Sequence, residues 1–135
     1  MADYSLRTRR DGSFDETVRL VRAALAEQGF GVLTEIDVAA TMKAKLGLEQ
    51  QPFLILGACN PPLAHQALQA EPSVGVLLPC NVVVREVERG CLVEAMDPLV
   101  MSGLTANAEV AEVAEQARHR IEAALRTITE APEGS

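Results

Sequence analysis

Apolar residues recur at helical spacing in two long stretches of the chain, which predicts two helices that each pack one face on a core. The first helix begins at the cap residue Ser13 and stops at Gly29, because Glu16 completes a capping box three residues after the serine. The second helix covers residues 110–128, and its apolar stripe should lie across the face of a sheet. That stripe consists of Val110, Val113, Ala114, Ala117, Ile121, Ala124, Leu125 and Ile128.

Between these helices, short alternating or wholly apolar runs predict a sheet. Residues 88–90 read as the turn of a hairpin. In one strand, alternation places Phe30, Val32 and Ile36 on one face and Glu35 on the other. The expected strands are residues 4–9, 30–36, 53–59, 81–87 and 91–96.

Two short helices are expected between the strands. Asp37 caps the first, which Gly47 closes, and Asn60 caps the second, which begins with two prolines and stops near Pro72. The inner side of the first is formed by Val38, Met42 and Leu46.

Residues 73–79 are apolar but contain Gly75 and end at Pro79, so a turn, a short helix or a strand would each fit. The element order predicts an α+β fold, with a mostly antiparallel sheet and helices packed on one face. Residues 1–130 are expected to form a single domain, and residues 131–135 a disordered tail.

The charge balance narrows the classes of partner. A net charge of −7, from 19 acidic and 12 basic residues, argues against a generic surface for nucleic acid or anionic membranes. The basic residues Arg7, Arg9 and Arg10 are interpreted as a solvated strand end.

The chain also lacks the features of an exported or membrane protein. No apolar run approaches the ~20 residues that span a bilayer, and the first residues lack the apolar region of a signal peptide. Three cysteines, an odd number without paired spacing, argue against a disulfide framework. A reducing, cytoplasmic location is therefore expected.

Two cysteine motifs are the candidates for chemistry. Gly57-Ala58-Cys59-Asn60 places a thiol at a strand end directly before a helix N-terminus, a position that lowers thiol pKa values and binds anions. Gly57 would allow close approach of a ligand or a backbone. Cys80 and Asn81 begin a later strand, and the two thiols would share a pocket if the two strands are neighbours.

Other polar residues carry less specific signals. Cys91 has no polar company and reads as a packing residue. Cys59, Cys80 and His65 are possible metal ligands, but their spacing matches no metal motif, so neither a metal nor a cofactor is predicted. Glu94 is expected to form a cross-strand ion pair near Arg85. Motifs for nucleotide binding, serine hydrolysis and zinc proteolysis are absent.

Several of these segments together resemble the bacterial and archaeal domain-of-unknown-function-302 family, over about residues 4–128. The resemblance implies a single-copy TATA-binding-protein-like fold, strand-helix-four strands-helix, assembled as a homodimer. It adds weight to Cys59, Asn60 and Cys80 as a site, but it does not imply DNA binding. The matching segments are the helix 14–25, Gly29-Phe30-Gly31-Val32, Glu35-Ile36, Gly57-Ala58-Cys59-Asn60-Pro61, Pro79-Cys80-Asn81-Val82-Val83-Val84 and Asp97-Pro98.

Three functions remain open at this point. The first is a homodimer that binds a small molecule or an anion in a cleft lined by Gly57, Cys59, Asn60, Cys80 and Asn81. The second is a thiol-based redox or transfer enzyme that uses Cys59, with Cys80 as resolving thiol. The third is a structural dimerisation or interaction module. Whether the protein is an enzyme is left open.

Overall fold

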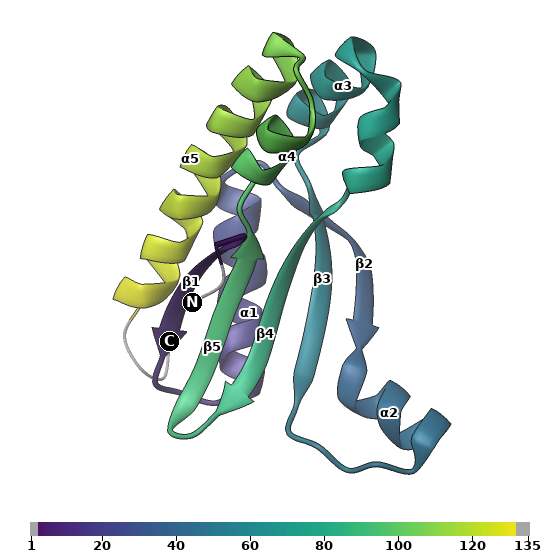
Figure 1. Cartoon of the computed structure of the whole chain (residues 1–135). Coiled ribbons are helices and arrows are strands. Elements are labelled where there is room, and N and C mark those ends of the chain that lie inside the picture. The colour runs from purple at the N-terminus through teal and green to yellow at the C-terminus, as the bar shows by residue number, and fades with distance from the viewer. Residues whose placement is uncertain (1–2, 132–135) are drawn as a thin grey trace.

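The structure, a computed structural model, describes residues 3–131 (Figure 1). Five antiparallel strands form one sheet in the order β1-β5-β4-β3-β2. This confirms the α+β class and the order strand, helix, four strands, helix, with short extra helices. The elements are β1 (Ser5–Arg10), α1 (Phe14–Glu27), β2 (Gly31–Asp37), α2 (Val38–Leu46), β3 (Phe53–Cys59), α3 (Pro61–Ala70), the 3-10 helix η1 (Pro72–Leu77), β4 (Cys80–Val87), β5 (Gly90–Met96), α4 (Leu99–Leu104) and α5 (Ala108–Glu130).

The two long helices cover one face of the sheet, and no helix of residues 3–131 lies on the opposite face, here called the uncovered face (Figure 1). Ser13 caps α1 through a hydrogen bond from the Glu16 N–H, as the capping box predicts. All eight residues of the predicted α5 stripe are buried. No helix among residues 3–131 is both long and apolar enough to cross a bilayer.

Only the second half of α5 packs on the sheet, which corrects the expectation that the whole stripe would do so. Its last four buried residues, from Ile121 to Ile128, join the core between the sheet and α1. The first four, from Val110 to Ala117, pack in a second core with α3, η1 and α4. Residues 73–79, for which the sequence left a turn, a short helix or a strand open, form mostly the 3-10 helix η1. Helix α4 is an element that the sequence pattern did not predict.

A β-bulge in β2 overturns the predicted face assignment of that strand. The register shifts between Val32 and Thr34, so Val32 stays on the helix-covered face whereas Ile36 turns to the uncovered face. Glu35 then lies on the helix-covered side, where its carboxylate pairs with Arg22 of α1. Simple alternation is wrong here because one extra residue reverses the side of every residue that follows it.

Arg10 is buried rather than solvated, and the interpretation of the early arginines as a solvated strand end is wrong for this residue. Its side chain is 3% exposed, and Nη2 lies 2.6 Å from Oε1 of Glu16. Arg7 and Arg9 are exposed, as expected. Burial of a guanidinium requires a paired carboxylate, and the capping-box glutamate of α1 supplies it.

Helix α2 is mostly exposed. Asp37 caps it, with Oδ1 accepting from the Ala40 N–H at 2.8 Å, and Gly47 ends it in the left-handed conformation, both as predicted. No residue of α2 is fully buried, and Leu46, which was expected on the inner side, is 64% exposed. The expected tail lies outside the described residues except for Ala131.

Candidate functional site

The end of β3 and the start of β4 bring the two candidate thiols to one small cavity. Cys59, Asn60 and Cys80 all line it, together with apolar residues of α3 and α5. The cavity arises because β3 and β4 are adjacent, with Ala58 opposite Cys80. Its volume is about 30 Å³. That is room for about one water molecule and far below the roughly 300 Å³ of an ordinary ligand pocket.

The other two candidate residues lie elsewhere. Gly57 is opposite both Thr34 and Asn81 in the sheet, in a row that belongs to the uncovered face. A Cβ atom on Gly57 would collide with Oγ1 of Thr34 and lie 2.8 Å from Cγ of Pro79, so the glycine makes room for these neighbours. The five candidate residues are therefore split between the two sides of the sheet.

Asn60 uses its side chain to join α3 to the end of α1. Its Oδ1 accepts from the Leu63 N–H at 3.4 Å, and its Nδ2 donates to the Gln28 carbonyl at 3.3 Å. The first two residues of α3, Pro61 and Pro62, have no N–H, and the Ala64 N–H already donates to the Asn60 carbonyl. The anion-binding interpretation thus loses the backbone donors on which it depends.

The environment of Cys80 does not favour thiolate chemistry. Burial, and secondarily the neighbouring Cys59, raises the pKa of the Cys80 thiol from 9.0 to about 11. Burial also raises the pKa of Cys91, which is fully buried in the core as a packing residue. A thiol that stays protonated at neutral pH is a poor nucleophile, so Cys80 is ill suited to act as a resolving thiol.

The possible metal ligands are not gathered. His65 is exposed on α3 and does not line the cavity of Cys59 and Cys80. Within residues 3–131, no group of three or more histidine, cysteine, aspartate or glutamate side chains is placed to hold a metal ion.

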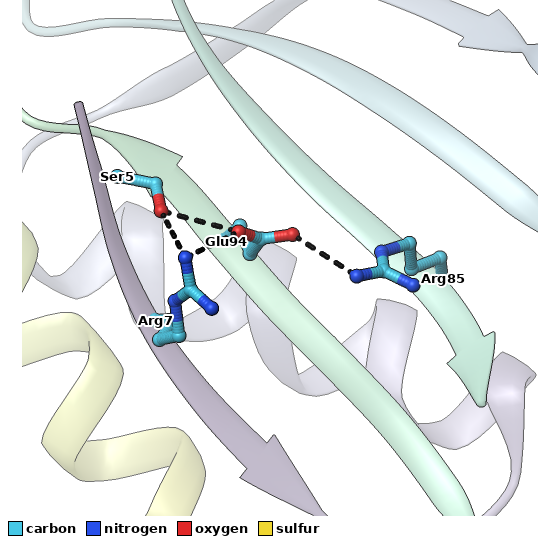
Figure 2. A network of polar contacts seen from close by, with 4 residues as sticks. All are labelled: Ser5, Arg7, Arg85 and Glu94. Carbon is cyan, nitrogen blue, oxygen red and sulfur yellow. Dashed lines mark hydrogen bonds and ion pairs between the residues drawn. The ribbon is translucent and has the colours of Figure 1, made fainter. Parts of the chain in front are cut away.

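A polar network crosses the uncovered face (Figure 2). The carboxylate of Glu94 on β5 lies 3.4 Å from Nη2 of Arg7 and 3.5 Å from Nη2 of Arg85, and it accepts from the Ser5 hydroxyl at 3.1 Å. The Arg85 pair is the cross-strand contact that the sequence predicted. The contacts that Ser5 and Arg7 of β1 make with Glu94 were not predicted. The network ties three strands together on a face that no helix protects.

Next to this network, the uncovered face becomes apolar toward the opposite edge of the sheet. One row of directly opposed residues runs from Glu94 through Val83 and Ile55 to Ile36. Beyond it, β2, the last residue of α2 and the loop that follows carry large exposed apolar side chains, here called the β2–α2 surface. It consists of Leu33, Ile36, Leu46 and Leu48, which are 66%, 50%, 64% and 54% exposed.

Comparison with known proteins identifies the family. The family model described as "Domain of unknown function DUF302" matches residues 4–128. The chain belongs to the DUF302 family. A crystal structure of an uncharacterized conserved protein DUF302 from Bacillus stearothermophilus is similar to this DUF302 domain, with a TM-score of 0.86 and 27% sequence identity over 94% of this chain and 99% of that chain. Among curated proteins, none matches significantly.

The raised pKa of Cys80 predicts how the stability of this DUF302 domain changes at alkaline pH. Between pH 9 and 11 the unfolded chain loses the thiol proton while the folded chain retains it, so the free energy of unfolding falls as the pH rises. We expect urea unfolding to show a loss of about 2 kcal/mol over this range that Cys80→Ala lacks. Other titrating groups are common to both proteins and cancel. Parallel stability curves for the two proteins would contradict this assignment.

Proposed function

We propose that this DUF302 domain functions as a homodimeric interaction module, in which a second copy packs on the β2–α2 surface. The observation that carries the proposal is the exposure of α2: its nine residues include none that is buried. An isolated helix shorter than ~12 residues is marginal in water, so α2 depends on packing for its stability. Within the chain it packs on the edge of the sheet at β2 and β3, and a partner would cover the rest.

The two edges of the sheet support the choice of this surface. β1 ends the sheet with the exposed arginines Arg7 and Arg9, and charged residues on an edge strand discourage pairing with another chain. β2 ends it with Leu33 and Ile36 exposed by half or more. The acidic side chains of β2 are engaged within the chain, Glu35 by Arg22 and Asp37 as the cap of α2, so the exposed apolar side chains of this edge are suited to a partner.

A second copy of this chain is the partner that we favour. The two exposed ion pairs near the surface, Arg22 with Glu35 and Lys43 with Glu49, are satisfied within one chain, so the leucines and Ile36 remain for an apolar contact. A patch of this kind can meet itself across a two-fold axis. The proposal includes the TATA-binding-protein-like fold that the family resemblance implies. The charge of −7 argues against nucleic acid.

The cavity of Cys59 and Cys80 does not support the small-molecule function that the sequence predicted. A space of about 30 Å³ holds no ligand of ordinary size. The three free cysteines support a reducing location, which the proposal includes.

Light scattering after size exclusion tests the proposal at micromolar protein concentration. We expect twice the monomer mass for the wild type, and Ile36→Lys should weaken self-association at least ~30-fold, about 2 kcal/mol, because it places a charge in an apolar contact. Val76→Lys is the matched control, since Val76 is an apolar residue 87% exposed on η1, outside the surface. Circular dichroism verifies that both variants fold.

Two results would contradict the proposal, the first by rejecting the homodimer and the second by rejecting the β2–α2 surface as its contact. One is a wild type that remains monomeric at every concentration up to the solubility limit. The other is a pair of lysine variants that weaken association equally, because the contact would then not involve the β2–α2 surface.

A further inference from the structure

A second, larger cavity lies between the N-terminal ends of α1 and α2 and the loop before β3, away from the thiols. Its volume is about 380 Å³. The first turn of α1, the first two turns of α2 and residues 49, 50 and 52–54 line it. This volume falls in the range of small-molecule sites, which are typically ~300–1,000 Å³.

The cavity combines an aromatic lining with an excess of carboxylates. Phe14 and Phe53, two of the three phenylalanines in the chain, line it together with Leu54. The charged lining residues are three acids and one base: Asp15, Asp37, Glu49 and Lys43.

One of the acids is already paired with the base. Nζ of Lys43 lies 2.8 Å from Oε1 of Glu49, a contact that joins α2 to the loop before β3. Asp37 uses Oδ1 to cap α2, which leaves its second oxygen for another donor. The carboxylates of Asp15 and Asp37 lie at the N-termini of α1 and α2, and no basic side chain of the lining pairs with either of them.

We propose that this cavity binds an organic cation, a compact apolar molecule that carries one ammonium group. Its apolar body would contact Phe14, Phe53 and Leu54, and its ammonium group would lie near Asp15 and Asp37. Aromatic faces and carboxylates both attract a cation, whereas they repel or leave unpaired an anion of the same shape. The inference is independent of the homodimer, because none of the four residues of the β2–α2 surface lines the cavity.

Three probes of one shape but different charge test the proposal on the full wild-type chain. They are 2-phenylethylammonium, neutral 2-phenylethanol and anionic 3-phenylpropionate, each titrated at pH 7 while amide shifts are followed by NMR. We expect saturable shifts at residues 14–15 and 37–43 with the ammonium probe, binding at least threefold weaker with the alcohol, and no binding with the carboxylate. Equal binding of the three probes, or no shift at these residues up to 10 mM, overturns the proposal.

A matched pair of variants locates the charge. Asp15→Asn is expected to lower the affinity for the ammonium probe about threefold without changing the affinity for the alcohol. Glu27→Gln removes one negative charge near the far end of the same helix, outside the cavity, and should leave both affinities unchanged. If the two variants lower the affinity for the ammonium probe equally, the effect comes from the overall charge of the protein and the site is rejected. Light scattering on the same samples reports the oligomeric state, so failure here is distinguishable from failure of the homodimer.

Discussion

Glutamine in place of Glu16 is expected to lower the free energy of unfolding by about 2–3 kcal/mol. Glu16 pairs with Arg10, whose side chain is only 3% exposed, at a distance of 2.6 Å. Breaking a buried ion pair typically costs ~3–5 kcal/mol, and the 21% exposure of Glu16 places this pair near the lower end. Glutamine keeps the shape of the capping box, so the change isolates the charge.

Urea unfolding followed by circular dichroism at pH 7 measures this effect. Glu27→Gln is the control, because Glu27 is exposed in the last turn of the same helix and its replacement should change stability by less than ~0.5 kcal/mol. Equal stability of the two variants would show that the Arg10 pair contributes little to the fold.

Alanine in place of Gly57 is expected to destabilise the domain by about 2–3 kcal/mol. The new Cβ would collide with Oγ1 of Thr34 and lie 2.8 Å from Cγ of Pro79, and overpacking of this kind typically costs ~1–3 kcal/mol. Gly31→Ala is the matched control in the neighbouring strand, because a Cβ there meets no atom within 4 Å. Gly31→Ala should be neutral or slightly stabilising.

A double variant checks the assigned cause. Removing the hydroxyl with Thr34→Ala should recover part of the stability that Gly57→Ala loses, so the two changes should couple favourably in a double-mutant cycle. Strict additivity, or equal stability of Gly57→Ala and Gly31→Ala, would mean that the strand shifts to accept the methyl group without cost.

The helices were predictable to a degree that the strands were not. The 3.6-residue period of α5 predicted all of its buried residues, because the period reports burial whatever the helix packs against. For the same reason it could not tell that the half before Ile121 contacts α3, η1 and α4 instead of the sheet. In β2 a period of two cannot reveal an inserted residue, so Ile36 was assigned to the wrong face.

The candidate site was predictable only in part. Adjacent strands bring Cys59 and Cys80 to one cavity, as the sequence suggested. Successive residues of a strand point to opposite faces, so Asn81 could not line the same pocket as Cys80. The burial of Arg10 depends on a carboxylate from α1, and no local pattern of charges shows which partner a side chain finds. The exposure of Leu46 and Leu48 could have been suspected, because a helix of nine residues that ends at a glycine has little surface with which to pack.

The division of α5 between two cores has a consequence for how the molecule holds together. The core under the sheet and the core around α3 and α4 share the continuous helix α5. Neither core can unfold without removing the packing of half of that helix. The two regions should therefore unfold as one cooperative unit.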